Sequence, residues 1–334
     1  MSDGAGDTAA LPTLADIGAA ARNVYAAMAP TAQYVWPLLA QRAGCEVWVK
    51  HENHTPIGAF KVRGGLNLMA QLELSMPRVP GVVSATRGNH GQSLAFAARQ
   101  RGIRCRIVVP EGNSRGKNAA MEALGAELVI HGSDFDAARE HAALLAQREG
   151  LRLVGPFEPE LVAGVATYAL ELFHTVHDID IVYAPIGCGS GICGLIAARD
   201  ALRLRTRIVG VVAAQANAYA QSFRAGRAIE TATASTIADG MAVRVPVPAA
   251  LAAIRRGAHD VVEVSDADIE SAMRAFFDDT HQVVEGAGAA GLAALLRARD
   301  RHGKRIALIA SGGNVDRDLY TRVLAGLAER RADA

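Results

Sequence analysis

Short runs of β-branched residues alternate with longer stretches of helical periodicity from about residue 80 onward. The candidate strands are residues 81–85, 104–109, 127–130, 180–184, 207–212 and 305–310. The stretches that carry apolar residues at helical spacing are 91–100, 116–124, 134–148, 159–174 and 266–278. This alternation is typical of βα units, in which mostly parallel sheets are flanked by helices. The sequence therefore predicts an α/β fold.

The size and the charge of the chain narrow the class of protein. With 334 residues, the chain exceeds the usual size of a single domain, so we expect two domains. Its 35 Lys and Arg residues nearly balance its 34 Asp and Glu residues, which leaves a formal net charge of +1. Such a chain has no global field to attract nucleic acid or an anionic membrane. A small-molecule partner is the expectation.

Signals for secretion, membrane insertion and disulfide bonding are missing from the sequence. The four cysteines form no CxxC pair and show no spacing typical of a zinc site or a disulfide framework, which favours reduced thiols. No window approaches the roughly 20 apolar residues that span a bilayer. The first residues lack the basic and apolar segments of a signal peptide. We therefore expect a soluble protein in the cytoplasm.

Lysine is scarce, since the chain holds only Lys50, Lys61, Lys117 and Lys304. Schiff-base chemistry requires an amine that can lose its proton, which the guanidinium of arginine does not do in proteins. Lys61 lies in HENHTPIGAFKVRGG, residues 51–65, where a loop enters a predicted helix. Its apolar neighbours Phe60 and Val62 would desolvate the amine and lower its pKa. The alternative is that Lys61, like most lysines at helix starts, is only solvated.

The stretch SATRGNHG, residues 84–91, follows a predicted strand and opens an alanine-rich helix. Its central residues are Thr86, Arg87, Gly88, Asn89 and His90. A turn of this kind presents free backbone N–H groups, which can hold a carboxylate. Taken alone, the stretch is equally compatible with a simple capped helix start.

A glycine-rich turn, PIGCGSGICG, occupies residues 185–194 between a predicted strand and a helix. Its alternate glycines allow close approach of the backbone to an anion, and the helix dipole adds attraction, so it favours phosphate binding. Read from Gly189 to Gly194 the turn also fits GxGxxG, which keeps an NAD-dependent oxidoreductase as an alternative. That fold needs an acidic residue after the next strand, whereas strand 207–212 is followed by Ala213, Ala214 and Gln215.

Two further elements are weaker when each is taken alone. Ser311 begins SGGN at the end of the last predicted strand, where glycines are ordinary turn residues. Glu285 opens EGAGAAG before a glycine-rich helix start, where an acidic residue is as often a partner of the helix dipole as a catalytic group. HENH is one residue short of the HExxH zinc motif, so we interpret it as structural and predict no metal site.

In this order, the strings GAFK, TRGNH, GCGSG, EGAGA and SGGN resemble the serine/threonine dehydratase branch of fold-type II pyridoxal 5′-phosphate (PLP) enzymes. This family is related in fold to the tryptophan synthase β-subunit. The resemblance runs from about residue 30 to about residue 325, and five strings with suitable spacing make it specific. It implies two domains, each with a central mostly parallel sheet flanked by helices.

The resemblance implies that Lys61 carries PLP as a Schiff base. It places Phe60 beside the cofactor ring, Asn89 on the 3′-oxygen and Ser311 at the pyridine nitrogen, and it adds Glu285 to the cofactor pocket. The phosphate would be held by backbone N–H groups of Gly187, Cys188, Gly189, Ser190 and Gly191. Because a hydroxyl, unlike a carboxylate, does not keep the pyridine nitrogen protonated, Ser311 favours loss of a β-leaving group.

The implied reaction is loss of water from a β-hydroxy amino acid. By resemblance, Lys61 removes the Cα proton and the β-hydroxyl leaves, which yields a 2-oxo acid and ammonia. The substrate-binding residues would be Thr86, Arg87, Gly88 and His90. Arg87 stands where serine racemases carry a serine, so racemisation is not the expected main activity. The rival within the same chemistry is a β-replacement enzyme similar to cysteine synthases.

The substrate side chain is less constrained. Threonine and serine are the default substrates, but two departures point toward phenylserine or 3-hydroxyaspartate. Arg87 could pair with a second acidic group, stack on an aromatic ring, or point to solvent. Many relatives hold a divalent cation with carboxylates after the strand that matches 207–212, and here that segment reads QANAYA. The resemblance therefore implies that this metal site is lost.

The resemblance also suggests the boundaries of the two domains. We expect residues 1–74 and 158–334 to form a large PLP-binding domain and residues 75–157 to form a small domain that closes over the substrate. We expect a homodimer, because relatives are commonly dimers. The chain is too short for the C-terminal regulatory domain of biosynthetic threonine deaminases, so feedback by that route is not expected.

Overall fold

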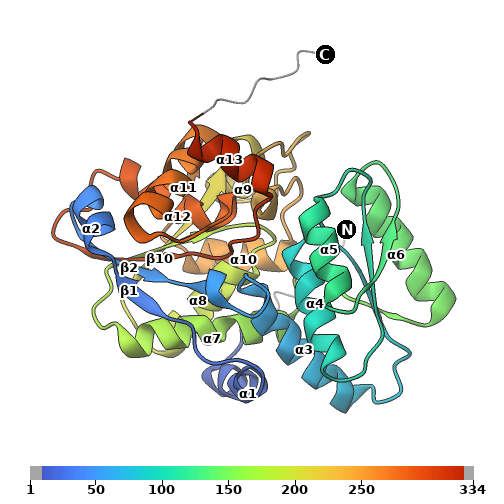
Figure 1. Ribbon diagram of the computed structural model, residues 1–334. Coiled ribbons are helices and arrows are strands. Elements are labelled where there is room, and N and C mark those ends of the chain that lie inside the picture. Colours follow the sequence, from blue (N-terminus) through green and yellow to red (C-terminus); the bar gives the residue numbers. More distant parts are fainter. Residues whose placement is uncertain (1–9, 327–334) are drawn as a thin grey trace, which may run out of the picture.

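The computed structural model describes residues 10–326 and contains two sheets with helices on both faces (Figure 1). The larger sheet has the strand order β1-β2-β10-β7-β8-β9. Its strands are β1 (Gln33–Val35), β2 (Glu46–Lys50), β10 (Arg305–Ile309), β7 (Ile181–Pro185), β8 (Arg207–Ala213) and β9 (Asp260–Val264). Neighbouring strands are parallel except for the edge pair β1 and β2. The predicted α/β fold is confirmed.

The smaller sheet is fully parallel, with the order β5-β4-β3-β6. Its strands are β5 (Glu127–Ile130), β4 (Cys105–Val109), β3 (Val82–Ala85) and β6 (Arg152–Leu153). The chain enters this sheet after forming part of the larger one and returns to the larger one afterwards. The smaller sheet and its helices α4, α5 and α6 therefore form one side of the molecule (Figure 1).

Helices account for most of the remaining described chain. Their bounds are α1 (Leu14–Tyr25), α2 (Pro37–Ala43), α3 (Lys61–Ser75), α4 (Asn89–Arg99), α5 (Arg115–Ala123), α6 (Phe135–Glu149), α7 (Pro159–Thr175), α8 (Ser190–Ala201), α9 (Ala218–Ala225), α10 (Pro248–Gly257), α11 (Asp266–Thr280), α12 (Gly286–Arg297) and α13 (Arg317–Leu324). Short 3-10 turns occupy Glu52–His54, Ala214–Ala216 and Asp239–Met241. None of the helices within residues 10–326 is both long and apolar enough to cross a bilayer.

Apolar side chains pack on both faces of the larger sheet. Helices α1, α7, α8 and α10 cover one face, and α2, α11, α12 and α13 cover the other. In β8, Ile208 and Val212 point to the first face, whereas Val209 and Val211 point to the second. Because successive side chains in a strand alternate, a strand buried on both faces reads as a continuous apolar run. This is the pattern on which the prediction of strand 207–212 rests.

The predicted strands and helices are all present, with ends that differ by a residue or two. The structure adds β1, β2, β6 and β9, which the sequence pattern did not reveal. The strand β1 has three residues and β6 has two, so neither is long enough to show a period. The strand β2 ends in Lys50, a charged side chain that is fully buried here because Glu171 pairs with it.

Candidate active site

Lys61 begins helix α3, directly after a turn that is tied to the end of β10. The Thr55 hydroxyl donates to the carbonyl oxygen of Ala59 at 2.8 Å and accepts from the Ala59 N–H at 2.9 Å. The Phe60 N–H donates to the carbonyl oxygen of Ser311 at 3.0 Å. The last of these bonds holds the chain just before Lys61 against the SGGN segment. The predicted position of Lys61, where a loop enters a helix, is confirmed.

The amine of Lys61 faces the start of helix α8. Its Nζ donates to the Oγ of Ser190 at 2.8 Å. Burial lowers the pKa of Lys61 below its ordinary value, and the nearby Cys188 thiol opposes that shift only in part. The positive end of the α8 dipole acts in the same direction as burial. The site therefore favours the free amine that Schiff-base chemistry requires.

The glycine-rich turn between β7 and α8 allows a ligand to approach its backbone closely. Gly189 caps α8 with a φ of 96°, a conformation that suits glycine. A Cβ on Gly187 would overlap the carbonyl oxygen of Gly240. Neither Cys188 nor Ser190 is among the non-glycine residues with positive φ in the described chain, so both replace glycine without strain. The first N–H groups of α8 are thus free to bind an anion.

Two tyrosines fix the shape of this turn from outside. Tyr219 donates its hydroxyl to the carbonyl oxygen of Cys188 at 3.2 Å and accepts from the Val247 N–H at 3.0 Å. Tyr168 donates to the carbonyl oxygen of Gly191 at 2.8 Å, and the Phe60 ring lies 3.5 Å from where a Cβ on Gly191 would be. The turn is held open by its neighbours rather than by its own side chains.

Residues 86–90 join β3 to α4 and face the larger sheet. The Gly88 N–H donates to the Thr86 hydroxyl at 3.1 Å. Asn89 begins α4 and donates its amide to Oε1 of Glu285 at 2.6 Å, while its Oδ1 accepts from the Asn314 amide at 2.8 Å. The structure therefore brings the TRGNH, EGAGA and SGGN motifs together.

His90 and Arg87 differ sharply although they belong to the same turn. His90 is buried, and neither ring nitrogen has a hydrogen-bond partner within residues 10–326. Burial and the charge of Lys61 lower the pKa of His90 to about 3, so its ring is neutral at pH 7. Arg87 is exposed and forms no hydrogen bond or ion pair within the same range. His90 is therefore buried near enough to Lys61 to feel its charge, whereas Arg87 is exposed to solvent.

Glu285 and Ser311 complete the group. Glu285 is buried just before α12, and burial raises its pKa, whereas Lys117 and the Asn89 amide favour the charged form. Ser311 is buried after β10, and its hydroxyl enters no side-chain hydrogen bond within the described residues. Glu285 is thus bonded to Asn89 and Lys117, whereas the Ser311 hydroxyl is available to a ligand.

Apart from Glu285, which lies between α11 and α12, these residues follow the carboxyl ends of strands. The turns follow β2, β3, β7 and β10, and the two sheets direct these ends toward each other. Ligands of open α/β sheets bind at such edges. The described residues contain no group of three or more His, Cys, Asp or Glu side chains that could hold a metal ion.

The family model for pyridoxal-phosphate dependent enzymes matches residues 26–312. The chain belongs to this family. It is 34% identical to an L-threonine ammonia-lyase of Thermotoga maritima over 93% of this chain and 78% of that protein. It is 31% identical to an L-threo-3-hydroxyaspartate ammonia-lyase of Saccharomyces cerevisiae, covering 95% of this chain and 97% of that protein. The predicted dehydratase class, a carbon–oxygen lyase, is confirmed.

Solved structures agree with the sequence comparison. A processed threonine deaminase isoform of Solanum lycopersicum aligns with a TM-score of 0.88 at 30% identity, covering 94% of this chain and 92% of that one. A second threonine deaminase, from an organism abbreviated T.th., aligns with a TM-score of 0.86 at 32% identity, covering 91% of this chain and 99% of that one. The cofactor of this chain is therefore PLP, as predicted.

The site of this chain fits PLP on its own geometry. The cofactor needs a desolvated lysine for its aldehyde and an anion seat for its phosphate, and Lys61 lies 2.8 Å from Ser190 at the start of α8. The unpartnered ring of His90 supplies further polar capacity inside the same site. The dinucleotide alternative for Gly189 and Gly194 gains no support from these observations.

Sequence reasoning missed two charged groups near the site. It interpreted HENH as structural without finding why, and the structure shows that Glu52 pairs with the fully buried Arg63, two residues after Lys61. It also passed over Lys117, which reaches Asp239 and Glu285 across the site. Lysine scarcity was the available signal for Lys117, since only four lysines had to be considered.

Proposed function

We propose that this enzyme removes water from a β-hydroxy-α-amino acid of the threonine, serine, phenylserine or 3-hydroxyaspartate type, releasing a 2-oxo acid and ammonia. One observation carries the proposal. The partly buried amine of Lys61, with a lowered pKa, lies 2.8 Å from Ser190 in the anion-binding turn before α8, and its charge acts on His90 in the turn of residues 86–90. A free amine at this place can both hold the cofactor and move a proton at Cα.

Bound PLP supplies an electron sink that makes the substrate Cα–H bond acidic. We assign the phosphate to the backbone N–H groups of residues 187–191, with the Ser190 hydroxyl beside them. Asn89 would contact the 3′-oxygen, Phe60 the ring and Ser311 the pyridine nitrogen. Glu285 would lie beside Asn89 and orient its amide through the 2.6 Å hydrogen bond. The unused hydroxyl of Ser311 supports its part of this assignment.

The substrate carboxylate would bind at the turn of residues 86–90. Thr86 offers a hydroxyl, and the neutral ring of His90 has no side-chain hydrogen-bond partner within the described residues. The start of α4 adds unpaired N–H groups and a favourable dipole. We propose that residues 75–157 move as a small domain, close this turn over the substrate and exclude water.

Arg87 is the residue that we assign to the substrate side chain. It lies next to the carboxylate-binding turn, is exposed, and has no ionic partner within residues 10–326. A guanidinium in this state binds a second carboxylate well, and it can also stack on an aromatic ring. The yeast relative is named for 3-hydroxyaspartate. We therefore propose that acidic 3-hydroxy amino acids are the preferred class, with aromatic ones as the alternative.

The first test is release of 2-oxo acid by the PLP-loaded enzyme from threonine, serine, threo-phenylserine and threo-3-hydroxyaspartate. We expect release from at least one, highest for threo-3-hydroxyaspartate, and loss of release in Lys61→Ala. Borohydride should fix the cofactor to Lys61 in the native protein and not in the variant. Release that persists in Lys61→Ala would refute the assignment. If Arg87→Ala leaves the substrate preference unchanged, Arg87 has no role in recognition.

A β-replacement enzyme is the second candidate. Such an enzyme would consume the same substrates only with an added nucleophile and would release no ammonia. Measuring ammonia with and without an added thiol separates the two reactions.

We also propose a cytoplasmic homodimer. The cysteines Cys45, Cys105, Cys188 and Cys193 are all free, which suits a reducing compartment. We propose a dimer because members of the family are commonly dimers. Sedimentation of the purified enzyme at micromolar concentration should give a particle of twice the chain mass, and a monomer at all concentrations would contradict the proposal.

A further inference from the structure

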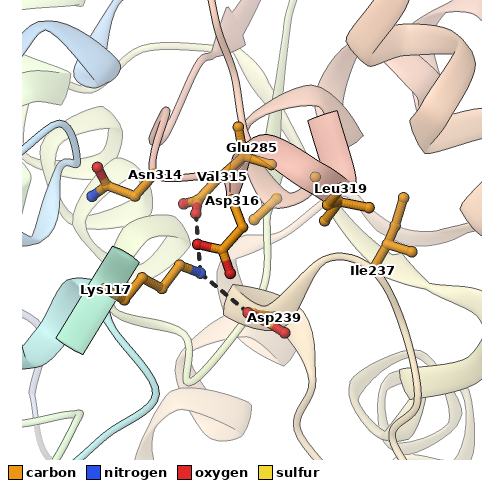
Figure 2. Close-up of a pocket in the computed structure, with 10 residues that line it drawn as sticks. Lys117, Ile237, Asp239, Glu285, Asn314, Val315, Asp316 and Leu319 are labelled. Carbon is orange, nitrogen blue, oxygen red and sulfur yellow. Dashed lines mark hydrogen bonds and ion pairs between the residues drawn. The ribbon is translucent and has the colours of Figure 1, made fainter. Parts of the chain in front are cut away.

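Helix α5 of the smaller sheet faces a cavity whose other walls belong to the larger sheet. Lys117 enters this cavity from α5, while Asp239, Glu285, Asn314 and Asp316 line it from the opposite side (Figure 2). Lys117 is the one lysine among the residues that line the cavity. The function proposed above assigns it no role.

The ammonium of Lys117 pairs with two carboxylates of the larger sheet. Its Nζ lies 3.1 Å from Oδ2 of Asp239 and 3.6 Å from Oε2 of Glu285 (Figure 2). Burial alone would lower the pKa of Lys117, but Glu285 and Asp239 outweigh it and the pKa is raised. Lys117 is therefore charged at neutral pH and links two parts of the molecule.

The stem of Lys117 also supports the turn of residues 86–90. A Cβ built on Gly88 would lie 2.5 Å from Cδ of Lys117, so the methylene chain packs directly against the Gly88 backbone. The same carboxylate of Glu285 accepts from Asn89 on its other oxygen. Lys117 and Asn89 thus contact the two oxygens of one carboxylate, which ties the turn of residues 86–90 to Lys117 through Glu285.

A second bond crosses the cavity from the same helix. Ser114, which caps α5, donates its hydroxyl to Oδ1 of Asp316 at 2.8 Å. The side chain of Asp239 is 45% exposed, and exposed ion pairs are weak enough to open and re-form. The Lys117 and Ser114 contacts can therefore favour the arrangement in which α5 lies against Asp239 and Asp316 and can still open.

We propose that Lys117 is a positioning residue that latches the smaller domain closed and holds the turn of residues 86–90 in place for the substrate carboxylate. The inference rests on the proposed function, because it takes that turn as the carboxylate site. The latch acts by raising the fraction of molecules in the closed, binding-competent form. A ligand that binds only this form has an apparent affinity reduced by the fraction that is open.

The experiment compares PLP-loaded Lys117→Met and Lys117→Arg with the native enzyme. We expect Lys117→Met to raise KM by about tenfold with a smaller change in kcat, because the closed fraction falls. The cofactor absorption band should be retained, and amide hydrogen exchange in residues 86–90 should become faster. Lys117→Arg keeps the charge and should recover most of the native KM. Lys304→Met, which removes a lysine paired with Asp300 on the larger domain, is the matched control.

Asp239→Asn provides a second route, because a half-exposed side chain is replaced without disturbing the core. It should raise KM in the same direction, and adding Lys117→Met to it should cost less than the two separate changes combined. A native KM and native exchange in Lys117→Met would overturn the latch. Loss of the cofactor band would overturn it too, since Lys117 would then hold the cofactor. Activity that persists in Lys61→Ala would instead refute the proposed function.

Discussion

Two ion-pair clusters near the site differ in burial and in the distances between their charged groups. The Arg63 cluster consists of Lys50, Glu52, Arg63 and Glu171, which lie outside the smaller sheet and its helices α4, α5 and α6. Arg63 donates to Glu52 at 2.7 Å and to Glu171 at 2.6 Å, and its side chain is 0% exposed. The Lys117 cluster consists of Lys117, Asp239 and Glu285 and spans the cavity between α5 and the side of the larger sheet, with longer distances and a partly exposed member.

The difference lies in how completely each cluster is satisfied. The Arg63 cluster has two positive and two negative groups, and Thr31 and Thr167 fill further hydrogen-bond positions. Buried charges persist only when they are paired in this way. Arg63 lies on α3, two residues after Lys61, so this fully paired cluster fixes the helix that begins at Lys61. In the latch that we propose, the Lys117 cluster lies where an ion pair forms and breaks in each turnover.

The largest expected effect comes from breaking the buried cluster. Arg63→Met leaves Glu52 and Glu171 short of a partner in the interior, which should lower the free energy of unfolding by about 3–5 kcal/mol. Denaturant unfolding of the PLP-loaded protein measures this change. A loss below about 1 kcal/mol would show that water or rearrangement compensates and that the cluster is not rigid.

Acid should lower the free energy of unfolding through His51, a residue beside the Arg63 cluster. His51 precedes Glu52, and burial lowers its pKa from 6.5 to about 4. Between these values the unfolded chain binds a proton that the folded chain does not, so stability falls as the pH falls. The expected slope is about 1.4 kcal/mol per pH unit for this group alone. Unfolding measured from pH 7 to pH 4 tests it, and imidazole NMR signals that show His51 protonated at pH 5.5 would contradict it.

Removing one charge from the Lys117 cluster should lower the free energy of unfolding far less than removing Arg63. Lys117→Met should lower the free energy of unfolding by about 1 kcal/mol or less, because Asp239 is partly exposed and Asn89 still bonds Glu285. Its effect should appear in KM instead. If Lys117→Met and Arg63→Met destabilise the fold equally, the distinction between a permanent cluster and a latch is wrong.

The smallest expected effect is the rise of KM with salt concentration, which should differ between the native enzyme and Lys117→Met. Raising the salt concentration from about 0.05 M to about 1 M shortens the screening length from over 10 Å to roughly 3 Å. The exposed part of the Lys117 cluster should weaken, and KM should rise roughly two- to threefold. Lys117→Met should show a smaller rise than the native enzyme, which serves as the control. An identical salt response in both proteins would place the effect elsewhere.

Local features of this protein follow from its sequence alone. Apolar runs predicted the central strands, and glycines after strands predicted the turns that surround Lys61, because turn geometry and strand burial depend on neighbouring residues. The pattern missed β1 and β6, which are too short to show a period, and β2, whose Lys50 is buried only because Glu171 lies opposite. Each such failure involves a partner distant in the chain.

Which distant charges meet is settled by the packing of helices and sheets in three dimensions. Lys117 and Asp239 are 122 positions apart, and Arg63 and Glu171 are 108 positions apart. No local period records such a pairing, because the first depends on how α5 lies against the larger sheet and the second on how α3 packs against α7. The sequence pointed to Lys61 through the chemistry of its side chain. The fold decided that Arg63 would anchor its helix and that Lys117 would reach across the cavity.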